Sequence, residues 1–264
     1  MKRYEAHERT AWTDHPWELI ETGPLMPLQH MALDQVLLDD VAAGRRAPTL
    51  RFWEWSAPAV VIGTFQSVRN EVDMQAADQH GIEVVRRISG GGAMFIEPGN
   101  SITYSVYAPK SLIAGMTFSE GYAAMDAFVL SALADLGIRA WYEPLNDIAT
   151  DAGKIAGAAQ AHRRDAVLHH VTMAYDIDAD KLMQVLRIGR EKMSDKGTQS
   201  AGKRVDPMRR QTGLAREVII DSMIDTFRRR HGLGTGALTP ADWALASQLV
   251  EEKFATDAWR FKVP

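Results

Sequence analysis

The chain has 264 residues, 46% hydrophobic and 24% charged, and its 30 Lys and Arg against 34 Asp and Glu give a formal net charge of −4. This ordinary composition predicts a globular protein with a substantial core and excludes collagen-like, coiled-coil and disordered chains. The near-neutral charge argues against a nucleic-acid partner, and the lack of an apolar run near about 18 residues argues against a membrane span. No cysteine occurs, which excludes disulfides, thiolate metal sites and a cysteine nucleophile.

The first half of the chain predicts one long helix and several short strands. In chain order we expect a helix over Pro27–Ala43, strands over Leu50–Trp55 and Ala59–Phe65, a helix over Val72–His80, and strands over Ile82–Arg87, Ala93–Ile96 and Asn100–Tyr107. The turn-forming residues Ser56–Pro58 predict that the first two strands form a hairpin. Because no hydrophobic segment follows Lys2 and Arg3, we expect no signal peptide and a cytoplasmic protein.

The second half predicts further strands and a helical C-terminal part over residues 178–264. The expected elements are a helix over Thr117–Leu136, strands over Ala140–Glu143, Lys154–His162 and Val167–Ile177, and helices over Glu217–Arg230 and Pro240–Phe254. The polar segment Met193–Arg204 is interpreted as a mobile surface loop. Together these elements predict an α+β fold in a single domain over residues 1–264, with a central mixed or antiparallel sheet flanked by helices.

A run of three glycines, Gly90–Gly92, directly follows a predicted strand. Without side chains, these residues let a ligand approach the backbone N–H groups. The other interpretation is a flexible β-turn. Arg87, just before the run, either holds an anion or forms a surface ion pair.

A further motif suggests an anion site. In a regular strand Lys154, Ala156, Ala158 and Gln160 share one face, which forms a slot of small residues with a cation at one end. The alternative is a small-residue strand under a packed helix.

Asn146 and Asp147 precede that strand and either help to bind Mg²⁺ or form a turn. His169 and His170 should point to opposite faces of their strand. The remaining histidines lack the spacing of metal ligands.

In this order, the motifs resemble the lipoate–protein ligase A family, which is grouped with biotin–protein ligases and octanoyl transferases. The resemblance covers most of the chain and rests on Met31–Asp34, Arg51–Trp55, Gly63–Gln66, Arg86–Ala93, Leu145–Ile148, Lys154–Gln160, Glu191–Gly197 and Arg204–Val205. It implies the catalytic-domain fold of that family and an ATP-dependent reaction. In that reaction lipoic acid and MgATP form lipoyl-AMP and pyrophosphate, and a lysine of an acceptor protein then attacks the lipoyl-AMP.

The resemblance also implies roles for individual residues. Lys154 would be the catalytic contact to the carboxylate and α-phosphate, and Asp147 would lie near Mg²⁺. The residues implied to bind lipoate or ATP are Arg87, Ser89, Gly90, Gly91, Gly92, Ala93, Asn146, Asp147, Gly157, Ala158 and His170.

The implied acceptor is a lipoyl domain or a glycine-cleavage H-type protein. Where many relatives carry His-Asp a few residues after the glycines, this chain has Ile96-Glu97. The sequence ends soon after Trp259–Phe261, where the catalytic domain should finish. We therefore expect no C-terminal accessory domain, and a separate small subunit is implied to supply it.

Two other functions stay open. One is octanoyl or lipoyl transfer between carrier proteins, which in the familiar enzymes uses a cysteine that is absent here. The other is a catalytically inactive, ligase-like subunit that serves assembly.

Overall fold

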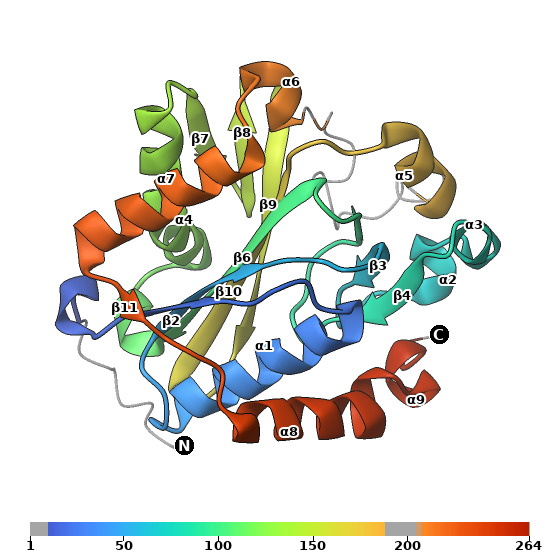
Figure 1. The fold of residues 1–264 in the computed structure, drawn as a ribbon, viewed down its shortest axis with the longest axis horizontal. Helices are drawn as coiled ribbons and strands as arrows, with labels where there is room; N and C mark the ends of the chain where they lie inside the picture. Colours follow the sequence, from blue (N-terminus) through green and yellow to red (C-terminus); the bar gives the residue numbers. More distant parts are fainter. Residues whose placement is uncertain (1–9, 188–204, 206, 264) are drawn as a thin grey trace.

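The computed structural model describes residues 10–187, 205 and 207–263 (Figure 1). The helices are the 3₁₀ turn η1 (Trp12–Asp14), α1 (Pro27–Ala42), α2 (Val68–Glu71), α3 (Met74–Gln79), the 3₁₀ turn η2 (Lys110–Ile113), α4 (Phe118–Asp135), α5 (Ala179–Val185), α6 (Met208–Thr212), α7 (Arg216–His231), α8 (Pro240–Leu249), the π-helical turn η4 (Val250–Phe254) and α9 (Asp257–Arg260). The strands are β1 (Glu18–Glu21), β2 (Thr49–Trp53), β3 (Ala59–Ile62), β4 (Glu83–Arg86), β5 (Met94–Ile96), β6 (Ser101–Pro109), β7 (Ala140–Glu143), β8 (Asp147–Thr150), β9 (Gly153–His162), β10 (Ala166–Ala174) and β11 (Gly234–Thr235).

The strands form two sheets. The large sheet has eight strands in the order β11-β1-β2-β6-β10-β9-β8-β7, and the small sheet has three in the order β4-β3-β5. In the large sheet β11, β1 and β2 run parallel to one another, and every other neighbouring pair is antiparallel. This arrangement confirms the predicted α+β fold with a mixed central sheet flanked by helices.

The predicted hairpin between the first two predicted strands, which are β2 and β3 in the structure, is wrong. β2 pairs with β1 and β6 in the large sheet, whereas β3 pairs with β4 and β5 in the small one. All residues of β2 and β3 are buried. Strands that are buried on both faces show no alternation of buried and exposed residues from which their partners can be predicted, and the turn residues between them favoured the wrong pairing.

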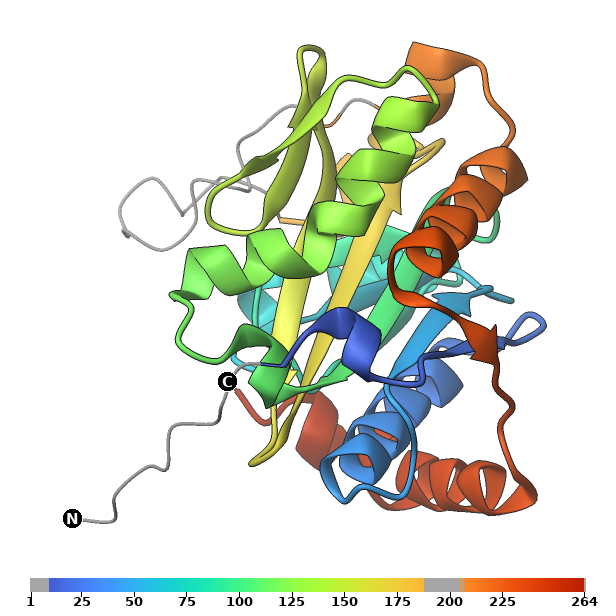
Figure 2. The ribbon, with the colours of Figure 1, turned by 90° about the vertical axis from the view of Figure 1, so that its left-hand side faces the viewer.

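Helices cover both faces of the large sheet. α4 and α7 pack on one face, where Phe128 and Phe227 join the main core cluster, while Leu37 of α1 packs on the other against Tyr107 and Leu168. In Figure 2, α1 and α8 lie side by side below α4 and α7. We call the two sides of the large sheet the α4 face and the α1 face.

Local sequence explains where the main helices begin. Thr117 caps α4 by accepting a hydrogen bond from the Glu120 N–H, and the Glu120 carboxylate accepts one from Thr117 in return. α1 begins with Pro27, whose missing N–H costs nothing at that position. No helix among the residues that the structure describes is long and apolar enough to cross a membrane.

Candidate functional site

The three-glycine segment folds over the side chain of Arg87. This arginine directly follows β4 and is 4% exposed. Its Nη2 donates to the carbonyl oxygens of Gly90 (2.6 Å) and Gly92 (2.8 Å), and its Nε donates to Ser89 Oγ (3.0 Å). Burial lowers the pKa of Arg87 to about 10, so the guanidinium stays charged at neutral pH. Arg87 therefore fixes the shape of the segment, which we call the glycine loop (residues 89–92).

The glycine loop lies directly against the strands beneath it. A Cβ built on Gly63, which follows β3, would lie 2.3 Å from the carbonyl oxygen of Gly91, so only glycine fits there. Gly91 has a φ of +88°, and a Cβ built on it would lie 3.6 Å from Cβ of Ala159 in β9. The loop thus packs on the α1 face of β9, the face that also carries His170 opposite Ala159.

A β-bulge places Lys154 on this same face. The register between β8 and β9 shifts after Ile148, so that Ile148 faces Ala156 but Ala149 faces Lys154, which leaves Ile155 as the extra residue. A Cβ built on Gly157 would lie 3.1 Å from Lys154 Nζ. The ammonium group therefore lies over Gly157.

The prediction that Lys154 shares a face with Ala156, Ala158 and Gln160 is consequently wrong. Ala156 and Ala158 pack in the core cluster on the α4 face, and the Ala158 side chain does not face the glycine loop. The small residues on the face of Lys154 are Gly157 and Ala159. The small residues that adjoin the cation are therefore one position along the strand from those predicted.

Asp147 neutralises part of the charge of Lys154. Lys154 Nζ lies 2.7 Å from Asp147 Oδ1, and Asp147 is 1% exposed. Asn146 holds the start of β8 on β9, because its Nδ2 donates to the Ala158 carbonyl oxygen (2.6 Å) and its own carbonyl accepts from the Ala158 N–H (2.8 Å). The segment with Asn146 and Asp147 precedes the Lys154 strand, β9, as predicted, and Asp147 also begins β8, which was not predicted.

A buried hydrogen-bond chain runs from the glycine loop to α1. Ser89 Oγ lies 2.5 Å from His170 Nε2, and His170 Nδ1 lies 2.7 Å from Asp34 Oδ2. Asp34 also accepts from Tyr107 (2.5 Å) and Ser105 (3.2 Å). Burial lowers the pKa of His170 although Asp34 opposes this, so the imidazole is neutral at pH 7.

The two neighbouring histidines serve different faces, as predicted. His169 Nε2 lies 2.7 Å from Asp126 of α4, whereas His170 reaches Asp34 of α1. Sequence reasoning missed Asp34. The signal was a carboxylate at a helix position otherwise surrounded by apolar residues, where a buried charge requires a partner.

Ile96 and Glu97, which stand where many relatives carry His-Asp, make structural contacts in this chain. Ile96 is fully buried in the core beneath α1, and the Glu97 carboxylate accepts hydrogen bonds from Lys181 of α5 and from Asn100. The segment 193–204 lies outside the described residues. Within the described part of the chain, no group of three or more His, Asp and Glu side chains forms a metal site.

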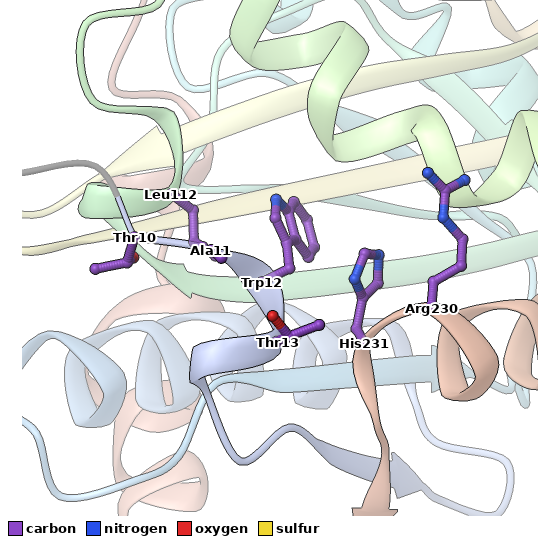
Figure 3. Close-up of a pocket in the computed structure, with 7 residues that line it drawn as sticks. All are labelled: Thr10, Ala11, Trp12, Thr13, Leu112, Arg230 and His231. Atoms are coloured by element: carbon purple, nitrogen blue, oxygen red, sulfur yellow. The ribbon is translucent and has the colours of Figure 1, made fainter.

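A surface depression of about 620 Å³ lies elsewhere on the molecule (Figure 3). It is lined by Thr10, Ala11, Trp12, Thr13, Leu112, Arg230 and His231. None of the predicted site residues lines it. Burial and the charge of Arg230 lower the pKa of His231 to about 4.

The chain is similar both to an octanoyltransferase and to lipoate-protein ligases. The family model described as "Lipoyl protein ligase A/B catalytic domain" matches residues 26–231. The chain is 28% identical to the octanoyltransferase LipM of Halalkalibacterium halodurans, with 93% of this chain and 99% of that protein covered.

Two similar solved structures are ligases. The first belongs to a bi-partite lipoate protein ligase described together with its E2 lipoyl domain from Thermoplasma acidophilum. It is 27% identical, with a TM-score of 0.77, and covers 97% of both chains. The second is a lipoate-protein ligase A bound with ATP. It is 26% identical, with a TM-score of 0.78, and covers 94% of this chain and 98% of that one.

Proposed function

Because the chain belongs to the lipoyl protein ligase A/B catalytic domain family, we propose that it is an ATP-dependent lipoate–protein ligase. In this proposal the lipoate carboxylate attacks the α-phosphate of ATP, which forms lipoyl-AMP and releases pyrophosphate. The amine of an acceptor lysine then attacks the acyl carbon, and AMP leaves as the amide forms.

The position of Lys154 is the observation that carries this proposal. Two anions, a carboxylate and a triphosphate, must approach each other before they react, and a fixed cation between them lowers the barrier. Lys154 Nζ lies over Gly157 on the face that the glycine loop covers, and Asp147 holds it at 2.7 Å. The acyl group is proposed to bind beside that cation, next to the glycine loop that packs on Ala159.

Asp147 fits a limited role toward magnesium. With ATP, Mg²⁺ takes most of its ligands from phosphate oxygens and water, so that one protein carboxylate suffices. When bound, the ion would withdraw charge from the phosphates. In the free chain Asp147 orients Lys154, and the carboxylate adjoins the place where the phosphates are proposed to bind.

The proposed protein partner is a lipoyl domain or an H-type protein that presents a lysine. The similarity to a bi-partite ligase described with its E2 lipoyl domain supports this class of partner. The same similarity supports a separate small accessory subunit. The chain itself is proposed to supply the catalytic residues.

Octanoyl transfer is the second candidate function, and the similarity to an octanoyltransferase over nearly the whole chain favours it. Against it, the familiar transferases use a cysteine nucleophile, and none of the 264 residues is a cysteine. An inactive assembly subunit is the third candidate. The intact cation and glycine loop argue against it.

The deciding experiment combines the purified chain, lipoic acid, MgATP and an apo lipoyl domain, with the intact mass of the acceptor as the readout. We expect a lipoyl-sized increase that requires ATP. Modification from supplied lipoyl-AMP but not from ATP would place the missing activation step in a separate subunit. Modification by an octanoyl thioester without ATP, and none with ATP and lipoate, would contradict the ligase and support the transferase.

A matched pair of variants assigns the activity to the site. Lys154→Ala removes the proposed cation, and we expect adenylate formation to fall by about 100-fold or more. Lys110→Ala removes a lysine from the turn η2, away from the predicted site residues, and should keep the wild-type rate. Equal rates for the two variants at matched folding would exclude Lys154 from the reaction.

A further inference from the structure

A largely exposed phenylalanine lies against the glycine loop. Phe65 is 80% exposed, and two of its ring carbons lie 3.7 and 3.8 Å from the Cβ position of Gly90. A second exposed ring, Phe261, follows α9 and helps to line a groove of about 440 Å³ between residues 68–75 and the end of the chain. Aromatic side chains are enriched in protein–protein interfaces, because they bury a large area and have few rotatable bonds. Both rings therefore favour a contact with another protein.

Lys262 connects the two rings into one surface. Its Nζ donates to Thr64 Oγ1 at 2.7 Å and lies 6.0 Å from the centre of the Phe65 ring. Beside it in the sequence, the Arg260 guanidinium lies 5.8 Å from the centre of the Phe261 ring. In Figure 1, α9 lies at the same end of the molecule as α2 and α3. The surface thus extends from the glycine loop to the groove.

This surface carries more positive than negative charge. Arg69 and Arg187 line the groove, where Asp73 is the one carboxylate among the described lining residues and lies 3.9 Å from Arg187. Within the part of the chain that the structure describes, neither Arg69 nor Lys262 forms an ion pair. Burial and the charge of Arg86 lower the pKa of Lys262. The exposed residues of this surface, which we call the cationic patch, are Phe65, Arg69, Phe261 and Lys262.

We propose that an acidic acceptor protein docks on the cationic patch and presents its lysine to the glycine loop. This inference rests on the proposed ligase function, because it names the surface that receives the second substrate. The acyl group is proposed to bind next to the glycine loop, and the Phe65 ring contacts that loop at Gly90. A protein seated on Phe65 therefore borders the place where its lysine has to react.

The charge of the patch favours an acidic protein over a second copy of this chain. A twofold dimer through the patch brings Arg69 and Lys262 close to the same cations of the second copy. Like charges that face each other across an interface weaken it, whereas an acidic partner is attracted and associates faster. The chain as a whole has a formal net charge of −4, so this attraction is local to the patch.

The binding test titrates an isotope-labelled apo lipoyl domain of net negative charge with the full chain, without nucleotide, and follows the domain by NMR. We expect a salt-sensitive complex, because both sets of charges are exposed. Phe65→Ala and Arg69→Glu should each raise the Kd by about tenfold or more, as for an aromatic anchor and a reversed charge in an interface. The Arg69→Glu complex should lose most of its salt dependence.

The kinetic test separates docking from activation of lipoate. Lipoate-dependent exchange of pyrophosphate into ATP needs no acceptor, so both variants should stay within about twofold of the wild-type rate. In the complete ligase reaction the KM for the lipoyl domain should rise about tenfold or more, with kcat nearly unchanged. This division distinguishes a docking residue from one that supports the fold of the site.

Two controls exclude a general effect of surface charge. Arg228→Glu reverses an exposed cation on α7, which packs on the α4 face of the large sheet, and should leave the Kd and the KM unchanged. Lipoyl domain variants in which one acidic residue near the acceptor lysine is replaced by lysine supply the charge swap. One of them should bind the Arg69→Glu chain more tightly than the unchanged domain does.

An unchanged Kd and KM in both patch variants would overturn the proposal, and so would equal weakening by Arg228→Glu. Loss of pyrophosphate exchange in the patch variants would also overturn it, because these residues would then serve activation rather than docking. A chain that binds the lipoyl domain through the patch but never exchanges pyrophosphate would uphold the inference and contradict the ligase function. A chain that lipoylates the domain with the same KM after both substitutions would do the reverse.

Discussion

Replacing Gly157 by alanine tests how closely the site depends on the position of the Lys154 ammonium. A Cβ at residue 157 would lie 3.1 Å from Lys154 Nζ and 3.3 Å from its Cε. Ordinary contacts between such atoms begin at about 3.5–4.0 Å, so the end of the lysine must move by roughly 0.5 Å. The contact is with a flexible side chain rather than with backbone, so the ammonium yields and the sheet does not.

The variant should therefore separate stability from activity. Gly157 lies in β9 and is not among the glycines with a positive φ, so alanine adopts the same backbone without strain. Fewer conformations of the unfolded chain then raise the free energy of unfolding by about 0.4–1 kcal/mol, before the cost of the moved lysine is subtracted. A misplacement of about 1 Å can cost about 100-fold in rate, so a shift of half that size should cost about tenfold in lipoyl-AMP formation.

Two measurements on the same preparation check this reasoning. Urea unfolding gives the free energy of unfolding, and lipoate-dependent release of pyrophosphate from ATP gives the rate. Gly23→Ala is the matched control, because no atom lies within 4 Å of its Cβ position. A fully active Gly157→Ala chain, or one that loses both stability and activity, would refute the assigned role of this contact.

Three further predictions follow from other contacts. Gly63→Ala places a Cβ 2.3 Å from the Gly91 carbonyl oxygen and should lower the free energy of unfolding by about 1–3 kcal/mol, as measured in urea; unchanged stability would contradict the close packing of the glycine loop. Burial, with Arg51 adding to it for His30, lowers the pKa values of His30 and His170, so the unfolded chain binds more protons below about pH 6.5. Stability should thus fall as the pH drops from 7.5 to 5.5, and a rise would show that these histidines are not buried as neutral groups. Arg86→Ala removes the guanidinium that donates hydrogen bonds to the carbonyl oxygens of residues 63, 66, 259 and 260. Amide hydrogen exchange in α9 should therefore become faster. Unchanged protection in α9 would refute the role of Arg86 in holding this helix.

Much of the fold was predictable because its main elements have clear periodicity. The helices α1, α4 and α7 and the strands β6, β9 and β10 lie within a few residues of their predicted bounds. The short strand β1 was missed inside a polar segment. β8 was missed because Asn146 and Asp147 favour turns. In the structure, hydrogen bonding of β8 to β7 and β9 outweighs this local turn preference.

The site was predictable in its parts but not in its assembly. Lys154 and Asp147 were singled out by residue type and Gly157 by the family resemblance, and the structure brings the three together. The bulge at Ile155 was invisible in the sequence, because one inserted residue changes the face of Lys154 without changing any side chain. Asp34 was missed because its partner, His170, is distant in sequence and meets it only when α1 packs on the large sheet.

The central claim is that the chain activates lipoate as an adenylate beside Lys154. The most direct measurement is lipoate-dependent exchange of labelled pyrophosphate into ATP, with wild type, Lys154→Ala and Lys110→Ala and no acceptor protein. The account predicts exchange that requires lipoate and Mg²⁺, is lost in Lys154→Ala and is kept in Lys110→Ala. Exchange that is equal in all three chains, or absent from a wild-type chain that modifies a lipoyl domain without ATP, would contradict it.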